Sequence, residues 1–257
     1  MNKILLEAKN ISKMYDLDTK NPFFAIKDIS LTVNKGDFIC IMGPSGSGKS
    51  TLINNISTID IPTKGQVYID GREINSMSEK EIGNFRFQEL GFMFQNYNLL
   101  QSLTIYENIV APLSLQKRKI KDINQRILNL ARPLKIDKIL DKFPSECSGG
   151  EKQRVSICRA LVSDPKIIIA DEPTGNLDSK NSHELLKILK KLNEEQIKTI
   201  IMVTHDPQIA SYSSKLIYLY DGKIVKELEK GKLSQKEYFY QIIKLISNNE
   251  QMNLVDD

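Results

Sequence analysis

One eight-residue stretch, Gly43–Ser50, constrains this chain more than any other part of the sequence. It has the sequence GPSGSGKS and follows an apolar run, Phe38–Met42, that is typical of a buried strand. The residues after it, Ser50–Ser57, have the composition of a helix. A glycine-rich loop between a strand and a helix lets backbone N–H groups surround phosphate groups, and the helix N-terminus adds partial positive charge. The sequence therefore predicts a phosphate-binding P-loop within an α/β fold.

Two side chains of this loop have predicted chemical roles. We expect Lys49 to reach the β- and γ-phosphates of a nucleotide and the Ser50 hydroxyl to be a ligand of Mg²⁺. The alternative is a glycine turn that matches the motif by chance. The strand before the loop and the helix after it argue against that alternative.

Two further apolar runs end in residues that suit nucleotide hydrolysis. Ile167–Ala170 is followed by Asp171 and Glu172, and Thr199–Val203 is followed closely by His205. Ligands bind at the carboxyl ends of strands in open parallel sheets. We expect Asp171 to hold the Mg²⁺ shell, Glu172 to act as general base, and His205 to contact the γ-phosphate or the attacking water. An acidic turn and a structural histidine are the alternative interpretations, and the P-loop makes both less favourable.

A fourth motif, Ser148–Glu151, has the sequence SGGE and two interpretations. It has the form of a capping box that opens a helix. However, each glycine in a helix costs about 1 kcal/mol relative to alanine. The two glycines make sense if a phosphate must approach bare backbone at a helix N-terminus. The motif lies about 100 residues after the P-loop, so a second copy of the protein could supply it.

The remaining patterns predict how the chain is layered. Short β-type runs beside glycine turns predict an antiparallel sheet from Ile4–Leu6, Ile29–Val33 and Val67–Ile69. The buried runs alternate with helical patterns, which predicts parallel strands joined by crossovers. Helices are expected over about 97–160, with Lys117–Lys119 in a solvated loop, and after Ser179. A last helix is predicted after a capping box of Ser234 and Glu237, with one apolar stripe of Tyr238, Phe239, Ile242, Ile243 and Ile246.

Together these motifs resemble the nucleotide-binding subunit of an ABC transporter over about residues 4–226. The matches are Gly43–Ser50 to Walker A, Gln95 to the Q-loop, Cys147–Glu151 to the signature, Ile167–Asp171 to Walker B, Gly175–Asp178 to the D-loop, His205 to the switch histidine and Tyr15 to the aromatic residue that stacks on adenine. The resemblance implies a P-loop NTPase with a RecA-like, mainly parallel core, an antiparallel β subdomain and an α-helical subdomain at about 97–160. Residues 227–257 would then form a C-terminal extension with an amphipathic helix.

The resemblance also implies ATP and Mg²⁺ as ligands and an ATP-dependent homodimer. ATP contacts within one chain are expected from Tyr15, Gly43, Pro44, Ser45, Gly46, Ser47, Gly48, Lys49, Ser50, Thr51, Gln95 and Asp171. Among these, Ser50, Gln95 and Asp171 are the expected metal ligands, and Glu172 and His205 are the expected catalytic residues. In this family two subunits hold two ATP molecules head to tail, so the residues expected to contact the partner's ATP are Ser148, Gly149, Gly150 and Glu151.

Several stretches resemble one branch of that family. Ile41–Pro44, Leu90–Gln95 and Asp171–Asp178 resemble subunits that serve FtsX-like or MacB-like permeases, and Phe94–Leu100 resembles bacitracin-resistance ATPases. This predicts an ATPase that powers such a permease in antimicrobial-peptide export or resistance, with a sensor histidine kinase reached through the permease. The alternatives are a regulatory or lipoprotein-release module and a soluble nucleic-acid ATPase. The last is disfavoured because only about 50 residues, without heptads or CxxC pairs, separate Gln95 from the signature.

The signature departs from the family pattern, and the composition limits where the chain can be located and what it can bind. Cys147 and Glu151 stand where Leu and Gln are usual, and Glu151 adds a negative charge near the phosphate end. No apolar run approaches the ~18 residues that span a bilayer, and Glu7 interrupts the start of the chain, so no signal peptide is expected. The net charge of +4 suits a chain near anionic lipid and gives no reason to expect nucleic acid. We expect a peripheral location at the cytoplasmic face of the cell membrane, through the permease.

Overall fold

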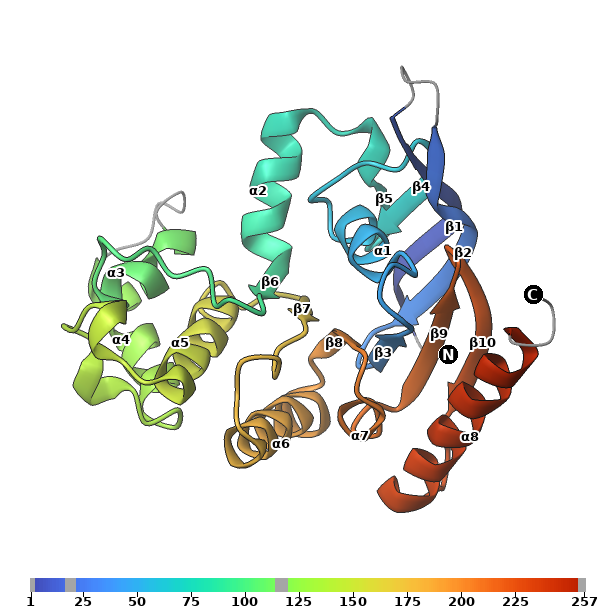
Figure 1. Ribbon diagram of the computed structural model, residues 1–257. Coiled ribbons are helices and arrows are strands. Elements are labelled where there is room, and N and C mark those ends of the chain that lie inside the picture. Colours follow the sequence, from blue (N-terminus) through green and yellow to red (C-terminus); the bar gives the residue numbers. More distant parts are fainter. Residues whose placement is uncertain (1–2, 17–21, 114–119, 254–257) are drawn as a thin grey trace.

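The computed structural model describes residues 3–16, 22–113 and 120–253, which form two sheets, the helices around them and a helical lobe (Figure 1). The strands of the larger sheet are β3 (Phe38–Met42), β6 (Leu90–Met93), β7 (Ile167–Asp171), β8 (Thr199–Thr204), β9 (Lys215–Tyr220) and β10 (Lys223–Glu229). They lie in the order β10-β9-β3-β8-β7-β6. All neighbours pair in parallel except β9 and β10. The predicted α/β fold with a mainly parallel sheet is confirmed.

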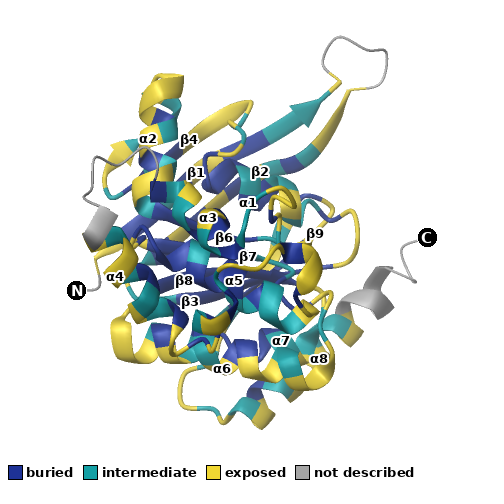
Figure 2. Cartoon of the chain, turned by 90° about the vertical axis from the view of Figure 1, so that its left-hand side faces the viewer, coloured by how far each residue is buried: buried dark blue, intermediate teal, exposed yellow. Residues whose placement is uncertain are grey.

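Three central strands of this sheet end at the same edge. Met42 at the end of β3 pairs with Thr204 of β8, and Asp171 at the end of β7 pairs with Val203. Every residue of β3 and β8 is buried, and β7 is buried up to Asp171 (Figure 2). The three apolar runs in the sequence are therefore buried parallel strands, as predicted. The segments that follow them meet at one edge, which is where open parallel sheets bind ligands.

A second sheet is antiparallel, as the short β-type runs predict. Its strands are β1 (Ile4–Tyr15), β2 (Phe23–Asn34), β4 (Lys64–Ile69) and β5 (Arg72–Glu73), in the order β2-β1-β4-β5. β1 is much longer than the predicted run, because its pairing with β2 continues through several register shifts as far as Tyr15 opposite Phe23. Helix α1 (Lys49–Ile56) lies between the two sheets (Figure 1). Its buried Leu52 and Ile56 share one apolar cluster with residues of both sheets.

The predicted helical region forms a lobe on one side of the sheets (Figure 1). Its α-helices are α3 (Ile105–Val110), α4 (Ile120–Ala131) and α5 (Gly149–Leu161), and short 3₁₀ turns join them. Helix α2 (Glu79–Glu89) precedes β6. Ser148 and Glu151 form the expected capping box at α5, and Thr104 and Glu107 form another at α3. Lys117–Lys119, the expected loop, lies outside the described residues.

The last helix packs differently from the predicted stripe. The remaining helices are α6 (Ser179–Gln196), α7 (Pro207–Ala210) and α8 (Gln235–Asn253). Ser234 and Glu237 form the expected capping box of α8. Tyr238 and Ile242 are fully buried in the main core, but Ile243 is 37% exposed. The prediction of one continuous stripe is wrong at Ile243. Each residue of a helix is turned by about 100° from the one before it, so Ile243 points away from the narrow face on which Ile242 is buried.

The C-terminal part of the chain continues directly from the larger sheet. The predicted start of the extension, after residue 226, lies inside β10. The Tyr238 hydroxyl donates a hydrogen bond to Leu228 O of that strand at 3.0 Å. Among the described residues, no helix is long and apolar enough to cross a membrane.

Candidate functional site

Two of the three glycines of the P-loop are required by close contacts with backbone. A Cβ atom at Gly43 would lie 2.0 Å from Leu219 O of β9, and one at Gly48 would lie 2.3 Å from Ala25 O of β2. Gly48 also has a φ of +96°, in the left-handed region that favours glycine, and it caps α1. The loop is therefore held between the two sheets, with the N-terminus of α1 directly behind it.

Lys49 lies over the loop that precedes it. Its Nζ donates hydrogen bonds to Gly43 O at 2.9 Å and Pro44 O at 2.7 Å. Burial lowers the pKa of Lys49, while the negative charges of Glu172 and Asp171 act in the opposite direction. The cation therefore stays close to two carboxylates at the edge where β3 and β7 end.

Asp171 and Glu172 follow β7 and have different environments. Burial raises the pKa of Asp171, the charge of Glu172 raises it further, and Lys49 opposes both. Glu172 has a φ of +46°, which is uncommon for a residue with a side chain, and its N–H donates to Val203 O at 3.0 Å. Its Oε1 lies 2.9 Å from His205 Nδ1. Val203 of β8 thus holds the backbone of Glu172, and His205 holds its carboxylate, at the end of the sheet. A positive φ at a residue with a side chain is a backbone strain that is typical of functional sites.

These elements line one cavity of about 740 Å³. The predicted site residues among its lining are Tyr15, Ser45, Gly46, Gly48, Lys49, Ser50, Thr51, Gln95, Asp171, Glu172 and His205. Gly43, Pro44 and Ser47 were also predicted to contact the ligand and lie outside this lining. The hydroxyl, amide and carboxylate oxygens of Ser50, Gln95 and Asp171 share the cavity. They fit Mg²⁺, which prefers hard oxygen ligands and one or two carboxylates beside phosphates.

The cavity also has lining residues that sequence reasoning missed. They are Phe23, Phe24, Ala25, Lys27, Val203 and Asp221. Lys27 and Asp221 form an ion pair at 2.9 Å. Phe23 is brought to the cavity by its pairing with Tyr15, and the two rings are 5.9 Å apart. That pairing follows register shifts between β1 and β2, so no local motif could have shown it.

The signature residues lie apart from this cavity. Ser148, Gly149, Gly150 and Glu151 stand at the N-terminus of α5, and none of them is in the cavity lining. The Ser148 N–H donates to Glu151 Oε2 at 2.7 Å, and the Ser148 hydroxyl donates to the same oxygen at 2.9 Å. Hydrogen bonds from the Ser148 backbone and hydroxyl lower the pKa of Glu151. The charge of Glu151 is therefore directed into the helix cap, and Cys147 beside it is buried.

The Q-loop is tied to the D-loop and to α5. Asn176 Nδ2 donates to Gln95 O at 2.9 Å, and the Tyr97 hydroxyl donates to Asn176 O at 3.4 Å. Arg159 of α5 donates to Tyr97 O and Asn98 O, each at 2.5 Å. Tyr97 and Asn98 both have positive φ, at 60° and 47°. Sequence reasoning missed Arg159, although an arginine among apolar residues late in α5 was a signal.

We expect Arg159→Met to lower the free energy of unfolding by about 2–3 kcal/mol, because two carbonyls lose charge-assisted hydrogen bonds at a strained turn. Arg159 is half-buried, and burial lowers its pKa, so water replaces these contacts only in part. Urea unfolding followed by circular dichroism measures the effect. Arg132→Met, at an exposed position, is the matched control. Equal unfolding free energies for the two variants would contradict the assigned role of Arg159.

Comparisons with known proteins give one consistent result. The family model described as "ABC transporter" matches residues 26–175. Bacitracin export ATP-binding protein BceA of Halalkalibacterium halodurans is 48% identical over 240 residues, which cover 93% of this chain and 94% of that protein. The macrolide export ATP-binding/permease protein MacB of Chlorobium phaeobacteroides is 43% identical over 229 residues, which cover 89% of this chain and 34% of that protein.

Solved structures give the same likeness in three dimensions. The dimeric structure of MJ0796, described as a bacterial ABC transporter cassette, has a TM-score of 0.82 and 40% identity, and covers 88% of this chain and 98% of that one. A curated relative of that name comes from Methanocaldococcus jannaschii. A post-hydrolysis dimer of MJ0796 bound to ADP and Pi has a TM-score of 0.81 and 39% identity, with the same coverage of both chains.

Proposed function

Since this chain belongs to the ABC transporter family and is an ATP-hydrolysing subunit of such a transporter, we propose that it powers a permease of the FtsX or MacB type in the export of peptide antibiotics. The observation that carries the proposal is the cavity in which Lys49, Glu172 and His205 meet. The 48% identity to a protein named for bacitracin export supports the substrate class.

Within this proposal, the P-loop binds the triphosphate. Its backbone N–H groups and Lys49 hold the β- and γ-phosphates, and the N-terminus of α1 adds positive potential. Ser50, Gln95 and Asp171 are the residues that would hold Mg²⁺. When bound, Mg²⁺ neutralises charge that develops on the phosphate oxygens. Tyr15 and the neighbouring Phe23 offer aromatic faces to the adenine base at the other end of the cavity.

Glu172 and His205 act on the attacking water. The water oxygen forms a bond to the γ-phosphorus, and its proton passes to the Glu172 carboxylate, which acts as general base. The bond between the γ-phosphorus and the β–γ bridging oxygen breaks, and ADP leaves with that electron pair. His205, 2.9 Å from Glu172 Oε1, orients the carboxylate and contacts the γ-phosphate. The products are ADP and inorganic phosphate.

The proposal includes two copies of the chain arranged head to tail. In it, Ser148, Gly149, Gly150 and Glu151 of one copy contact the ATP held by the other. Two observations support this: these residues do not line the cavity of their own chain, and they present a helix N-terminus with two glycines. The similar cassette MJ0796 has a dimeric structure.

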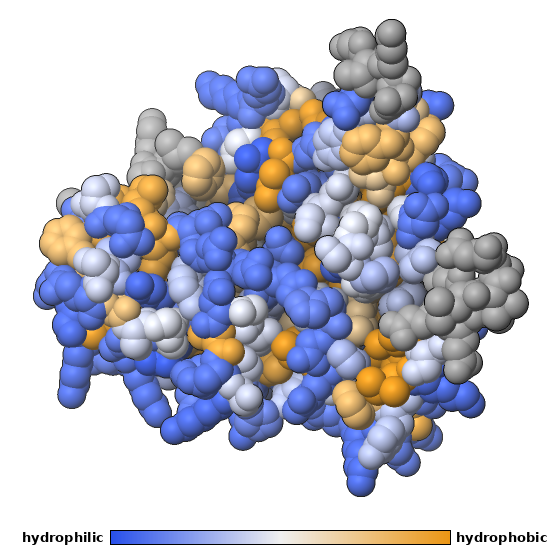
Figure 3. Space-filling view, in the orientation of Figure 1, coloured by the Kyte–Doolittle hydropathy of each residue, from blue (hydrophilic) through white to orange (hydrophobic). Residues whose placement is uncertain are grey.

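We assign the contact with the permease to the helical lobe. The lobe follows Gln95 and carries exposed apolar side chains, among them Leu100 at 58% and Phe143 at 43% exposure. Figure 3 shows apolar side chains gathered on this part of the surface. Exposed apolar patches of this kind are typical of protein interfaces. The chain would then be peripheral at the cytoplasmic face of the cell membrane, and a sensor histidine kinase would be reached through the permease.

Survival in bacitracin tests the proposed function. Cells that lack this chain but keep the proposed permease receive either the wild-type chain or the Glu172→Gln variant. We expect the wild-type chain alone to restore growth, and we expect both chains to co-purify with the permease in detergent. Equal survival with the two chains would contradict an ATP-driven role in resistance. Restored growth in a macrolide but not in bacitracin would instead assign a different substrate class.

A further inference from the structure

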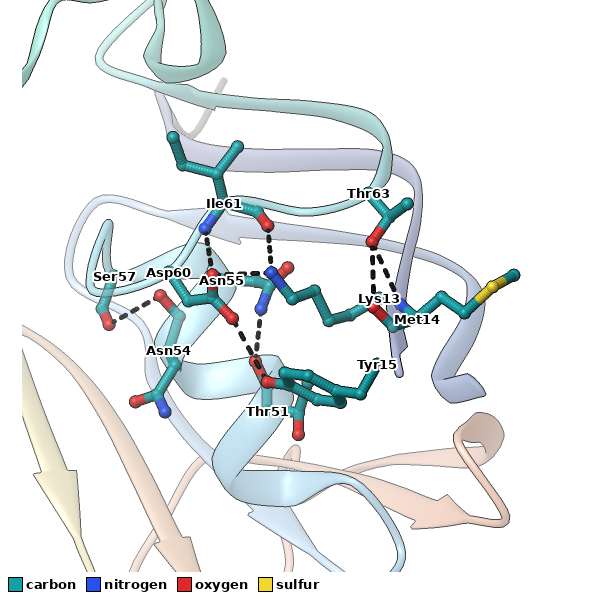
Figure 4. A network of polar contacts seen from close by, with 10 residues as sticks. All are labelled: Lys13, Met14, Tyr15, Thr51, Asn54, Asn55, Ser57, Asp60, Ile61 and Thr63. Atoms are coloured by element: carbon teal, nitrogen blue, oxygen red, sulfur yellow. Dashed lines mark hydrogen bonds and ion pairs between the residues drawn. The ribbon is translucent and has the colours of Figure 1, made fainter. Parts of the chain in front are cut away.

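The hydroxyl of Tyr15 belongs to a partly buried polar network (Figure 4). It donates a hydrogen bond to Asp60 Oδ2 at 3.2 Å. The other carboxylate oxygen, Asp60 Oδ1, accepts from Lys13 Nζ at 2.6 Å and from the Ile61 N–H at 2.8 Å. Lys13 also donates to Ile61 O at 2.8 Å, and its Nζ lies 5.4 Å from the centre of the Tyr15 ring. Three side chains therefore fix one another at the end of β1.

The loop that carries Asp60 is anchored on both sides. The Asp60 N–H donates to Asn54 O in α1 at 3.1 Å. The Thr63 N–H donates to Ser12 O of β1 at 2.8 Å, and Thr63 Oγ1 accepts from the Met14 N–H at 3.1 Å. The loop thus joins the C-terminal end of α1 to β1. Since α1 begins at the P-loop, the same helix connects the phosphate end of the cavity to the support of Tyr15.

Lys13 and Asp60 lie behind the cavity. Tyr15 is among the residues that line it, whereas Lys13 and Asp60, both described by the structure, are not. Their side chains are only 15% and 31% exposed. Although burial raises the pKa of Asp60, the hydrogen bonds from Lys13 and Ile61 outweigh it, so the net pKa is lowered. The carboxylate is therefore ionised at neutral pH, and hydrogen bonds to an ionised acceptor are stronger than neutral ones.

We infer that Asp60, held by Lys13, is a positioning residue that fixes the Tyr15 ring for stacking on the adenine base. This role rests on the proposed contact between Tyr15 and the base. An aromatic side chain that is ordered before the ligand arrives loses less conformational freedom on binding. Of the described residues that hydrogen-bond the Asp60 carboxylate, only Tyr15 lines the cavity. The loss of Asp60 should therefore change recognition of the base and leave recognition of the phosphates unchanged.

The test compares Tyr15→Phe, Asp60→Asn and the double variant. Tyr15→Phe keeps the ring and removes only the hydroxyl. It therefore still tests the hydrogen bond if the Asp60→Asn variant fails to fold. We expect each single variant to raise KM for ATP about five-fold with little change in kcat, as for the loss of one hydrogen bond. The double variant should show no larger change than either single one. The inhibition constant of inorganic tripolyphosphate, which has no base, should stay at the wild-type value.

Matched controls come from a second lysine–tyrosine pair in the same sheet. Lys9 Nζ lies 4.9 Å from the centre of the Tyr68 ring, and neither residue lines the cavity. Lys9→Met and Tyr68→Phe should therefore leave KM unchanged, whereas Lys13→Met should raise it.

Two outcomes separate this inference from the proposed function. If Tyr15→Ala leaves KM unchanged, the proposed base contact is wrong and the role of Asp60 fails with it. If Tyr15→Ala raises KM but Tyr15→Phe and Asp60→Asn do not, the base contact stands and the inference about Asp60 is overturned. A weaker binding of tripolyphosphate by Asp60→Asn would also overturn it, because the change would then act on α1 and the P-loop.

Discussion

Glu172→Gln is expected to lower ATP turnover at least about a hundred-fold while ATP binding is retained. The amide has nearly the shape of the carboxylate but cannot accept the proton of the attacking water. The backbone contact to Val203 does not depend on the side chain, so the strained turn should persist. Phosphate release measures turnover, and equilibrium dialysis with ATP measures binding. Because ATP is bound but not hydrolysed, the paired form should also last longer in gel filtration.

Glu195→Gln is the matched control for this variant. Glu195 lies on α6, and its side chain is 62% exposed. Within the described part of the chain its one ion pair is with Lys191, one turn earlier on the same helix. Its loss should leave turnover within a factor of about two, as for most surface substitutions. Undiminished turnover in Glu172→Gln would remove Glu172 from the chemistry and would leave the position of His205 unexplained.

A mixture of two inactive variants, Lys49→Ala and Ser148→Arg, is expected to regain turnover. In Lys49→Ala both P-loops lack the lysine that is proposed to contact phosphate, and in Ser148→Arg a large side chain should block both signatures. A mixed pair contains one site with an intact P-loop from one chain and an intact signature from the other. With equal amounts, random pairing should restore roughly a quarter of wild-type turnover in a two-fold symmetric dimer.

The control for the mixing experiment removes the last intact site. Lys49→Ala is mixed with a chain that carries both substitutions, so that every P-loop is defective in every pair. This mixture should stay inactive. If the first mixture also stays at the level of its separate components, the signature does not act on the partner's ATP. Turnover at the wild-type rate by the unmixed Ser148→Arg variant would show that the signature is dispensable for turnover.

The parts of the fold that could be predicted are those in which local sequence decides the structure. The runs Phe38–Met42 and Ile167–Ala170 are apolar at every position, as is typical of a short strand buried on both faces, and the P-loop lies within eight consecutive residues. The last helix shows the limit of such patterns. The apolar residues of α8 all follow the helical spacing of three and four positions. Only packing against the core decides that Tyr238 is buried and Ile243 is exposed.

The parts of the site that could not be predicted depend on contacts between distant residues. Tyr15 and Phe23 face each other only because register shifts between β1 and β2 are tolerated, and a bulge has no reliable sequence signal. Asp60 is 45 positions from Tyr15 and looks like an ordinary turn residue in the sequence. Arg159 contacts two carbonyls about 60 positions away. In each case the sequence shows which kind of contact the side chain can make, but it does not show which distant residue the side chain contacts.

The length of α1, eight residues, sets the distance between the P-loop at one end of the cavity and the loop that supports Tyr15 at the other. The helix rises about 1.5 Å and turns about 100° per residue, so it spans about 12 Å from Lys49 to its last turn. One residue more or fewer would rotate the following loop away from β1 and separate Asp60 from Tyr15. The length of this helix is therefore constrained in addition to the side chains that it buries or presents to the cavity. Insertions and deletions should be tolerated in the loops of the helical lobe and excluded between Lys49 and Asp60.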